Sequence, residues 1–111
     1  MVLTHVPLHP GATGEQALLW NYDEVLSLLQ CSGPGVVAMV LAGHYHPGGY
    51  AMDEYATHHV TLPSPLNQKE DDPRCHCTIE IWHDRIEILG TGLVPKRTLS
   101  IDQMHHSKCS C

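Results

Sequence analysis

The sequence contains no phenylalanine and few basic residues. Of its 111 residues only six are Lys or Arg, against twelve Asp or Glu, and the formal net charge is −6. A surface that binds nucleic acid needs clustered basic side chains to neutralise phosphates, so we expect no nucleic-acid partner. The chain also lacks any apolar stretch of ~18 residues, the length that spans a bilayer, so we expect no membrane-spanning segment.

A secretory leader is likewise not evident, because the first residues have neither a basic segment nor a long apolar one. Four of the five cysteines form two Cys-x-Cys pairs, Cys75/Cys77 and Cys109/Cys111. An odd cysteine count with this spacing suits a disulfide framework poorly. We therefore expect reduced thiols and a cytoplasmic protein.

The length predicts one small domain rather than two. Apolar residues make up 42% of the chain, which is enough for a core. We assign residues 1–97 to this domain and residues 98–111 to a polar, flexible tail.

The first half of the chain has the pattern of a strand–helix–strand unit. Residues 2–4 indicate the end of a buried strand. Thr13 and Gln16 have the spacing of a capping box, and apolar residues then recur with helical period over 18–29. Gly33, followed by Pro34, predicts the end of this helix. The apolar run 36–42 is typical of a central parallel strand.

The second half is typical of antiparallel strands. Residues 43–50 are rich in Gly and His and indicate a loop, and 58–62 is a weaker strand candidate. Residues 63–74 are polar and contain three prolines, which favours a surface loop. Residues 78–82 and 86–89 are rich in β-forming side chains around the turn 83–85, the pattern of a hairpin. The expected fold class is therefore α/β.

The ten histidines are an unusual load for this length. His5 follows the first predicted strand and His44 follows the second, so both should lie at the same edge of the sheet, beyond the strands' carboxyl ends. His46 lies two residues further on, and Gly43 offers the freedom for a sharp turn. Ordinary loop histidines are the alternative, but Gly-His-x-His after an all-apolar strand favours a site for Mn, Zn or Fe.

Five segments of the sequence resemble the calcineurin-like metallophosphoesterases. The resemblance is greatest to the manganese-dependent ADP-ribose/CDP-alcohol diphosphatases, and it extends from about Leu3 to about Arg97. The segments that carry it are Leu-Thr-His-Val-Pro-Leu-His-Pro, Leu-Leu-Trp-Asn-Tyr-Asp-Glu-Val-Leu, Ala-Gly-His-Tyr-His-Pro-Gly-Gly-Tyr, Thr-His-His-Val-Thr-Leu and Gly-Thr-Gly-Leu-Val-Pro.

This resemblance implies the C-terminal portion of an αββα sandwich, a βαβ unit followed by antiparallel strands. It also implies two divalent metal ions, with His5 and His44 binding one and His46 the other. Manganese is favoured, with zinc or iron as alternatives. The implied reaction is hydrolysis of the phosphoanhydride bond of nucleotide diphosphates such as ADP-ribose and CDP-alcohols.

The motifs that supply the remaining ligands and a catalytic histidine in that family do not occur in this chain. They are Asp-x-His, Gly-Asp-x-x-Asp and Gly-Asn-His followed by Asp or Glu. Asp53, Asp71, Asp72 and Asp84 lie in the wrong order to replace them. We therefore expect no catalytic residue here, an N-terminal part needed for the full site, and an isolated chain that is inactive or nearly so.

A further set of residues could lie beside the metal ligands or against substrate: His9, Tyr45, Gly48, Gly49 and His59. Tyr45 stands where close relatives usually carry Asp. For His9 an ordinary loop role is equally favoured, and Gly48 and Gly49 are assigned first to a turn whose N–H groups could meet a phosphate. His58 and His59 alternate along a strand, and a structural role is favoured for both.

Trp20 and Tyr22 could stack on a nucleotide base, but packing against the protein is the favoured role.

Two alternative interpretations stay open. In the first, the chain is a non-catalytic zinc module built from Cys75-His-Cys77 and from His105, His106, Cys109 and Cys111, although Cys-x-Cys is not the usual zinc spacing. In the second, it is an inactive truncated product with an unpaired edge at its first strand.

Overall fold

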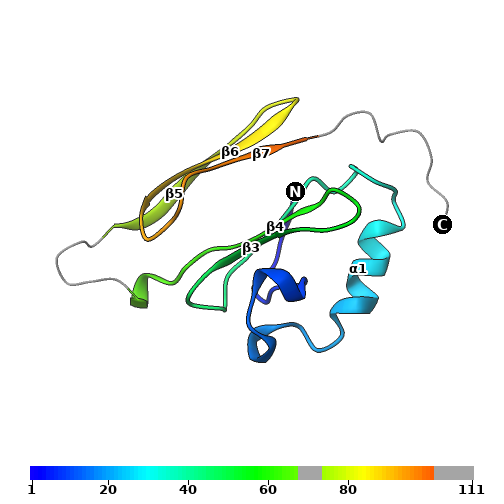
Figure 1. Cartoon of the computed structure of the whole chain (residues 1–111), viewed down its shortest axis with the longest axis horizontal. Helices are drawn as coiled ribbons and strands as arrows, with labels where there is room; N and C mark the ends of the chain where they lie inside the picture. The colour runs from blue at the N-terminus through cyan, green and yellow to red at the C-terminus, as the bar shows by residue number, and fades with distance from the viewer. Residues whose placement is uncertain (68–73, 102–111) are drawn as a thin grey trace.

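The computed structural model describes residues 1–67 and 74–101 in two stacked sheets. Figure 1 shows the layers: the three-stranded sheet β5-β6-β7 covers one face of the four-stranded sheet β1-β2-β4-β3, and the helical segments lie beyond its other face. The arrangement agrees with the expected α/β class and with one side of a layered sandwich.

The four-stranded sheet has the predicted parallel centre. β1 (Val2–Leu3) and β4 (His58–Thr61) each pair in parallel with β2 (Met39–Ala42). β3 (Gly49–Met52) runs antiparallel to β4 at one edge. The predictions of strands at 2–4 and 58–62 are confirmed, but β3 lies partly in the segment predicted as a loop.

The connection from β1 to β2 is less helical than predicted. It contains two 3₁₀ turns, η1 (Pro10–Ala12) and η2 (Glu15–Ala17), and one helix, α1 (Tyr22–Gln30). The predicted start at Thr13 is wrong: its backbone is extended and its hydroxyl donates to the Gly14 carbonyl. The Leu19 N–H instead donates to the Pro7 carbonyl at 3.0 Å, a tertiary bond that competes with the helix.

The end of α1 agrees with the prediction, but the start of β2 does not. Gly33 has a positive φ of 98°, which suits the end of a helix. Gly35 also has a positive φ, and Val36 is 56% exposed. The apolar run thus begins in a turn, and only its second half forms the buried strand.

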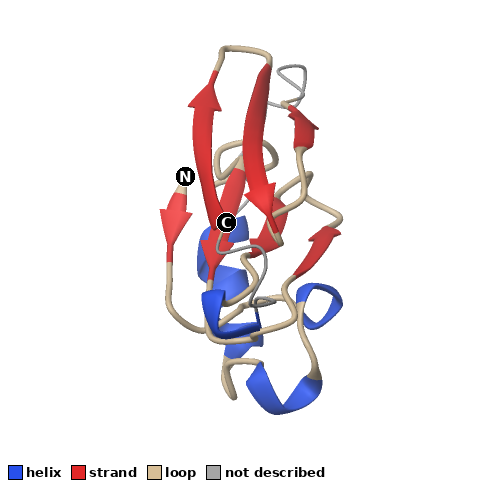
Figure 2. Ribbon diagram, turned by 90° about the vertical axis from the view of Figure 1, so that its left-hand side faces the viewer, coloured by secondary structure: helices blue, strands red, loops and turns tan. Residues whose placement is uncertain are grey.

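The hairpin prediction is confirmed, with longer strands than expected. β5 (Cys75–Ile81) pairs antiparallel with β6 (Arg85–Gly92), and β7 (Arg97–Ser100) pairs with the other edge of β6 (Figure 2). A short turn, η3 (Pro65–Asn67), precedes the hairpin. Residues 98–100, which we assigned to the tail, belong to β7; residues 102–111 lie outside the described residues.

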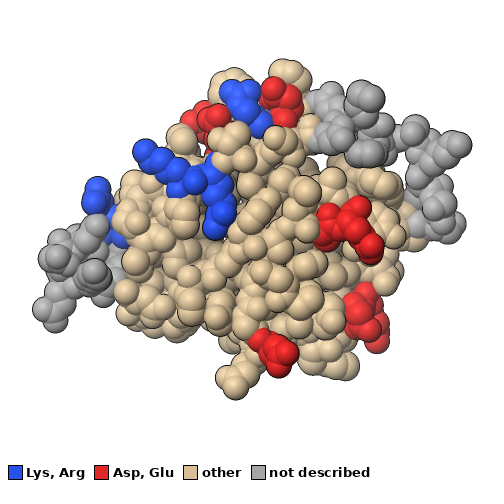
Figure 3. All heavy atoms as spheres, viewed as in Figure 1, with Lys and Arg blue, Asp and Glu red and all other residues tan. Residues whose placement is uncertain are grey.

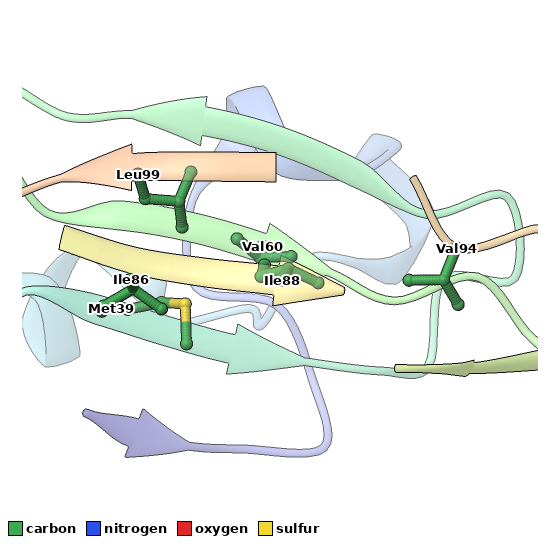
Figure 4. Packing of buried hydrophobic residues seen from close by; sticks show 6 residues of the cluster. All are labelled: Met39, Val60, Ile86, Ile88, Val94 and Leu99. Atoms are coloured by element: carbon green, nitrogen blue, oxygen red, sulfur yellow. The ribbon is translucent and has the colours of Figure 1, made fainter. Parts of the chain in front are cut away.

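The core lies between the two sheets. Figure 4 shows Met39 and Val60 from one sheet facing Ile86, Ile88 and Leu99 from the other, with Val94 at one end. All six side chains are at most 5% exposed. Alternation along β6 puts every second residue into this layer, which is why the hairpin has a clear two-residue period.

In the part of the chain that the structure describes, no helix is long and apolar enough to cross a membrane.

Candidate metal centre

His5 and His44 lie side by side at the carboxyl ends of β1 and β2. The parallel pairing continues into the loops, because Thr4 N–H donates to the Leu41 carbonyl at 3.0 Å and Gly43 N–H donates to the His5 carbonyl at 3.1 Å. The two imidazole rings meet edge to face, with centroids 5.1 Å apart. Both residues are exposed, so their ring nitrogens can reach a ligand from solvent.

The sharp turn after β2 is made by His44 itself. Its φ is 62°, in the left-handed region that L-residues with a Cβ occupy at a cost of about 1–2 kcal/mol. Gly43, which we expected to supply this freedom, does not have a positive φ. Strained backbone of this kind gathers at ligand-binding positions, where surrounding structure maintains it.

His46 lines the same open cavity as His5 and His44. The cavity holds about 420 Å³, and the segment 62–65 also lines it. No Asp or Glu is among the described residues that line it. Across residues 1–67 and 74–101, no group of three or more His, Cys, Asp or Glu side chains has the arrangement to hold a metal ion. The structure therefore brings two imidazoles into contact and the third into the same cavity.

His9 and His59 belong to a different cluster, on the helical face of the four-stranded sheet. Their rings stack with centroids 4.8 Å apart. The Nδ1 atom of His9 accepts the Gly11 N–H at 3.0 Å, and His59 Nε2 lies 2.9 Å from Asp53 Oδ2. Asp53 also accepts the N–H groups of Tyr55 and Thr57.

Opposing influences act on the two buried partners of this cluster. Burial favours a raised pKa for Asp53, but the hydrogen bonds from His59, Thr57 and Tyr55 lower its pKa below the ordinary value. Burial lowers the pKa of His59, and the nearby Asp53 offsets this only in part. The pair is therefore a carboxylate with a neutral imidazole that donates from Nε2, which leaves His59 Nδ1 buried and unpartnered.

His58 points to the opposite face and joins the two sheets. Its Nε2 donates to the Ser100 carbonyl at 2.7 Å, so its Nδ1 accepts the Tyr50 hydroxyl at 2.8 Å. These contacts agree with the structural role favoured for both histidines.

Three other predicted residues have clear surroundings. Tyr45 lines the histidine cavity and packs against Gly14, where an added Cβ would lie 3.0 Å from the tyrosine ring. Gly48 has a φ of 75°, and Gly49 packs so closely on η1 that a Cβ would overlap the Ala12 carbonyl oxygen. Gly48 thus serves the turn, as first assigned, whereas Gly49 belongs to β3 and is required by the close approach of η1.

The two aromatic residues near α1 differ from expectation. Trp20 is 87% exposed, so the packing role favoured for it is wrong. Tyr22 lines a separate open cavity between α1 and the segment 52–54.

The cysteines of β5 do not form a metal site with their histidine neighbour. Cys75 and Cys77 are free thiols that pack against the core cluster, and burial raises the pKa of Cys77. His76, on the other side of the strand, contacts the Thr91 hydroxyl. Strand alternation thus puts the two thiols on one face of β5 and separates His76 from both. Cys31 is disulfide-bonded, so the expectation of reduced thiols fails there. The predicted zinc ligands at 105–111 lie outside the described residues.

Asp53 and Arg97 make tertiary contacts that sequence reasoning missed, although neither lines the histidine cavity. Asp53 was considered only as a replacement metal ligand. Asp side chains also commonly accept hydrogen bonds from backbone N–H groups a few residues further on and so stabilise turns. Arg97 was placed at the domain end, and its contact with the Tyr50 ring depends on pairing that no local pattern indicates.

Comparisons with known proteins find relatives that match most of this chain. No family model matches the chain. It is 45% identical over 98 residues to a manganese-dependent ADP-ribose/CDP-alcohol diphosphatase from Xenopus tropicalis, covering 88% of this chain and 28% of that protein. It is 34% identical over 93 residues to the protein of that name from Arabidopsis thaliana, with 82% and 28% covered.

A solved structure supports the same relationship. The crystal structure of a dimetal phosphatase from Danio rerio has a TM-score of 0.83 and 31% identity to this chain, covering 91% of it and 32% of the phosphatase. The chain spans less than a third of the length of the curated relatives that it matches. By sequence and by fold, the chain is therefore homologous to part of the manganese-dependent ADP-ribose/CDP-alcohol diphosphatases, a group of metallophosphoesterases.

Proposed function

We propose that this chain supplies the imidazole part of a dinuclear metal site that hydrolyses the phosphoanhydride bond of nucleotide diphosphates such as ADP-ribose and CDP-alcohols. The observation that carries the proposal is the contact between the His5 and His44 rings, centroids 5.1 Å apart, with His46 lining the same cavity. The names of the relatives supply the substrate class.

The residues present fit part of a divalent metal site. Imidazole nitrogens suit Zn and Fe, and the His5 and His44 side chains are exposed at the cavity rather than bonded to one another. Manganese favours carboxylate oxygen, which the described residues do not bring to this cavity, so its preference here comes from the names of the relatives. His5 and His44 are assigned to one ion and His46 to the other, and manganese is preferred over zinc or iron.

The chemistry of such a site needs groups beyond these three. Bound divalent ions in a pair neutralise phosphoryl charge and activate water near neutral pH. The contribution of this chain is to hold its imidazoles at the carboxyl ends of two parallel strands, whose pairing limits their movement. Because no carboxylate of residues 1–67 or 74–101 lines the cavity with them, we expect negligible turnover from the isolated chain.

Metal titration tests the assignment directly. Mn²⁺ and Zn²⁺ are titrated by calorimetry into wild type, into the His44→Ala/His46→Ala double variant, and into His76→Ala as a matched control on an exposed strand. We expect the double variant to lose at least ~10-fold in affinity and the control to keep wild-type affinity. Equal binding by all three proteins would refute the site.

A chimera tests the reaction. This chain replaces the corresponding part of the Xenopus tropicalis diphosphatase, and phosphate-ester products from ADP-ribose and CDP-choline are measured. The expected result is hydrolysis that falls at least ~100-fold in the chimera carrying His44→Ala/His46→Ala. A chimera that folds and binds manganese but hydrolyses neither compound would overturn the proposed activity.

A further inference from the structure

A second cavity lies next to the histidine cavity, between the two sheets. It holds about 140 Å³, and the carboxyl end of β4 forms part of its lining. Leu62 and Pro63 line both cavities, and the chain passes from one to the other between His46 and Pro47. A molecule bound at the histidines could therefore extend a neighbouring group into this space.

Apolar side chains form one side of this second cavity, and Thr61 and Arg97 add polar groups. Val60, Ile88 and Val94 are buried core side chains that form its floor, and Leu93 lies at its exposed rim. A cavity of about 150 Å³ is large enough to hold a benzene molecule. The size and the mixed lining thus favour a flat aromatic group that carries polar edge atoms over a hydrated phosphate.

Arg97 is the one charged residue among the described residues that line this cavity. Its guanidinium lies over the Tyr50 ring, 4.7 Å from the centroid, and Tyr50 is fixed in turn by its hydroxyl bond to His58. Within residues 1–67 and 74–101, no carboxylate pairs with Arg97. On the face shown in Figure 3, basic side chains gather over the three-stranded sheet, in a protein of net charge −6.

The Arg97 guanidinium distinguishes the nucleobase end of a nucleotide substrate from the end that carries an alcohol such as choline. Guanidinium groups donate to the oxygen and nitrogen acceptors on nucleobase edges and stack on their faces. A cationic alcohol such as choline would be repelled by the same charge. The chemistry therefore favours the base end.

We propose that the cavity lined by Arg97, Leu93 and Leu62 binds the heteroaromatic base of a nucleotide substrate and so orients the nucleoside end toward β6 and β7. This inference rests on the proposed function for the choice of substrate. Gly48 and Gly49 form the opposite wall with backbone alone, and a Cβ at Gly48 would lie 3.0 Å from the Thr61 carbonyl oxygen and the Pro63 nitrogen.

The probes are chosen so that metal binding is not needed. Adenosine, cytidine and choline, none of which carries a phosphate, are titrated into the ¹⁵N-labelled chain without added metal. The amide signals of Gly48, Leu93 and Arg97 report on the cavity, and that of Glu80 in β5 serves as a distant control. We expect the nucleosides to shift the cavity signals with affinity in the millimolar range, and choline to shift none.

Two variants and one control complete the test. Arg97→Gln removes the positive charge, and Leu93→Ala removes most of the apolar side chain at the rim of the cavity. Each variant should weaken nucleoside binding at least threefold. Arg85→Gln is the matched control, because Arg85 also stacks on an aromatic ring, that of Trp82, but does not line the cavity. Unchanged thermal unfolding in Arg97→Gln and Leu93→Ala separates lost contacts from lost folding.

The outcomes distinguish this inference from the proposed function. Nucleoside shifts at the cavity that Arg97→Gln weakens would support the base site even if manganese failed to bind at the histidines. Absence of nucleoside shifts, or equal shifts with choline, would overturn the base site while leaving the metal assignment to its own titration.

Discussion

The Nε2 atom of His59 lies 2.9 Å from Oδ2 of Asp53, and both side chains are at most 4% exposed. The bond ties β4 to the turn that follows β3, because Asp53 also accepts the N–H groups of Tyr55 and Thr57. The imidazole ring of His9 stacks on the ring of His59. The loop that leads away from His5 is thus anchored to the sheet by a buried polar pair.

Replacing Asp53 should destabilise the fold. In Asp53→Asn the new NH₂ group faces the Nε2–H donor of His59, and the other imidazole tautomer, which would accept from it, would leave a buried Nδ1–H donor without an acceptor. We expect a loss of about 1–3 kcal/mol in the free energy of unfolding, measured by urea denaturation. Glu54→Gln, at the exposed neighbouring position, should change it by less than ~0.5 kcal/mol. Equal effects would contradict the anchoring role.

Acid should weaken the same region in two stages. The folded pKa of His59 is lowered, so the unfolded chain takes up its proton first, and stability falls as pH drops below the ordinary histidine value of 6.5. The folded pKa of Asp53 is also lowered, so its contribution is present above 3.8 and is lost as pH falls further. Melting temperatures should fall as pH drops below 6.5 and again as it drops below 3.8, and the first fall should be smaller in His59→Gln. An unchanged slope in this variant would contradict the assignment.

The left-handed backbone at His44 predicts a difference between two variants that both remove the imidazole. His44→Gly relieves the strain that His44→Ala keeps, so the glycine variant should be more stable by about 1 kcal/mol. For a domain of this size that corresponds to roughly 4–8 °C in Tm, measured by calorimetry. Equal melting temperatures would mean that the turn relaxes.

The close approach of β3 to η1 predicts unequal glycine substitutions. A Cβ at Gly49 would overlap the Ala12 carbonyl oxygen, whereas a Cβ at Gly43 would meet nothing closer than 3.8 Å. Gly49→Ala should cost about 1–3 kcal/mol through overpacking. Gly43→Ala should be nearly neutral, and denaturant unfolding of both variants checks the contrast.

The cysteines separate the metal assignment from the zinc-module alternative. Cys75→Ser/Cys77→Ser changes two thiols that face the core rather than the histidine cavity. We therefore expect Mn²⁺ and Zn²⁺ affinities equal to those of wild type in calorimetric titration. Abolished metal binding in this variant would favour the zinc module instead.

Local sequence periodicity predicted much of the fold. The two-residue period of the hairpin and the helical period before Gln30 are properties of short segments, and they placed β5, β6 and α1. The start of α1 could not be placed in this way, because the Leu19–Pro7 bond is formed only in the folded chain. For the same reason β3 and β7 were missed, since each is a short strand defined by its partner.

The sequence by itself determined that His5 and His44 follow neighbouring parallel strands, and strand topology then required them to share an edge. Tertiary structure alone decided which side chains gather elsewhere. Asp53 and His59 meet because β3 and β4 pair, and Arg97 reaches Tyr50 because the second sheet covers the first. Such contacts depend on packing between segments far apart in the chain, where no local periodicity records the partner.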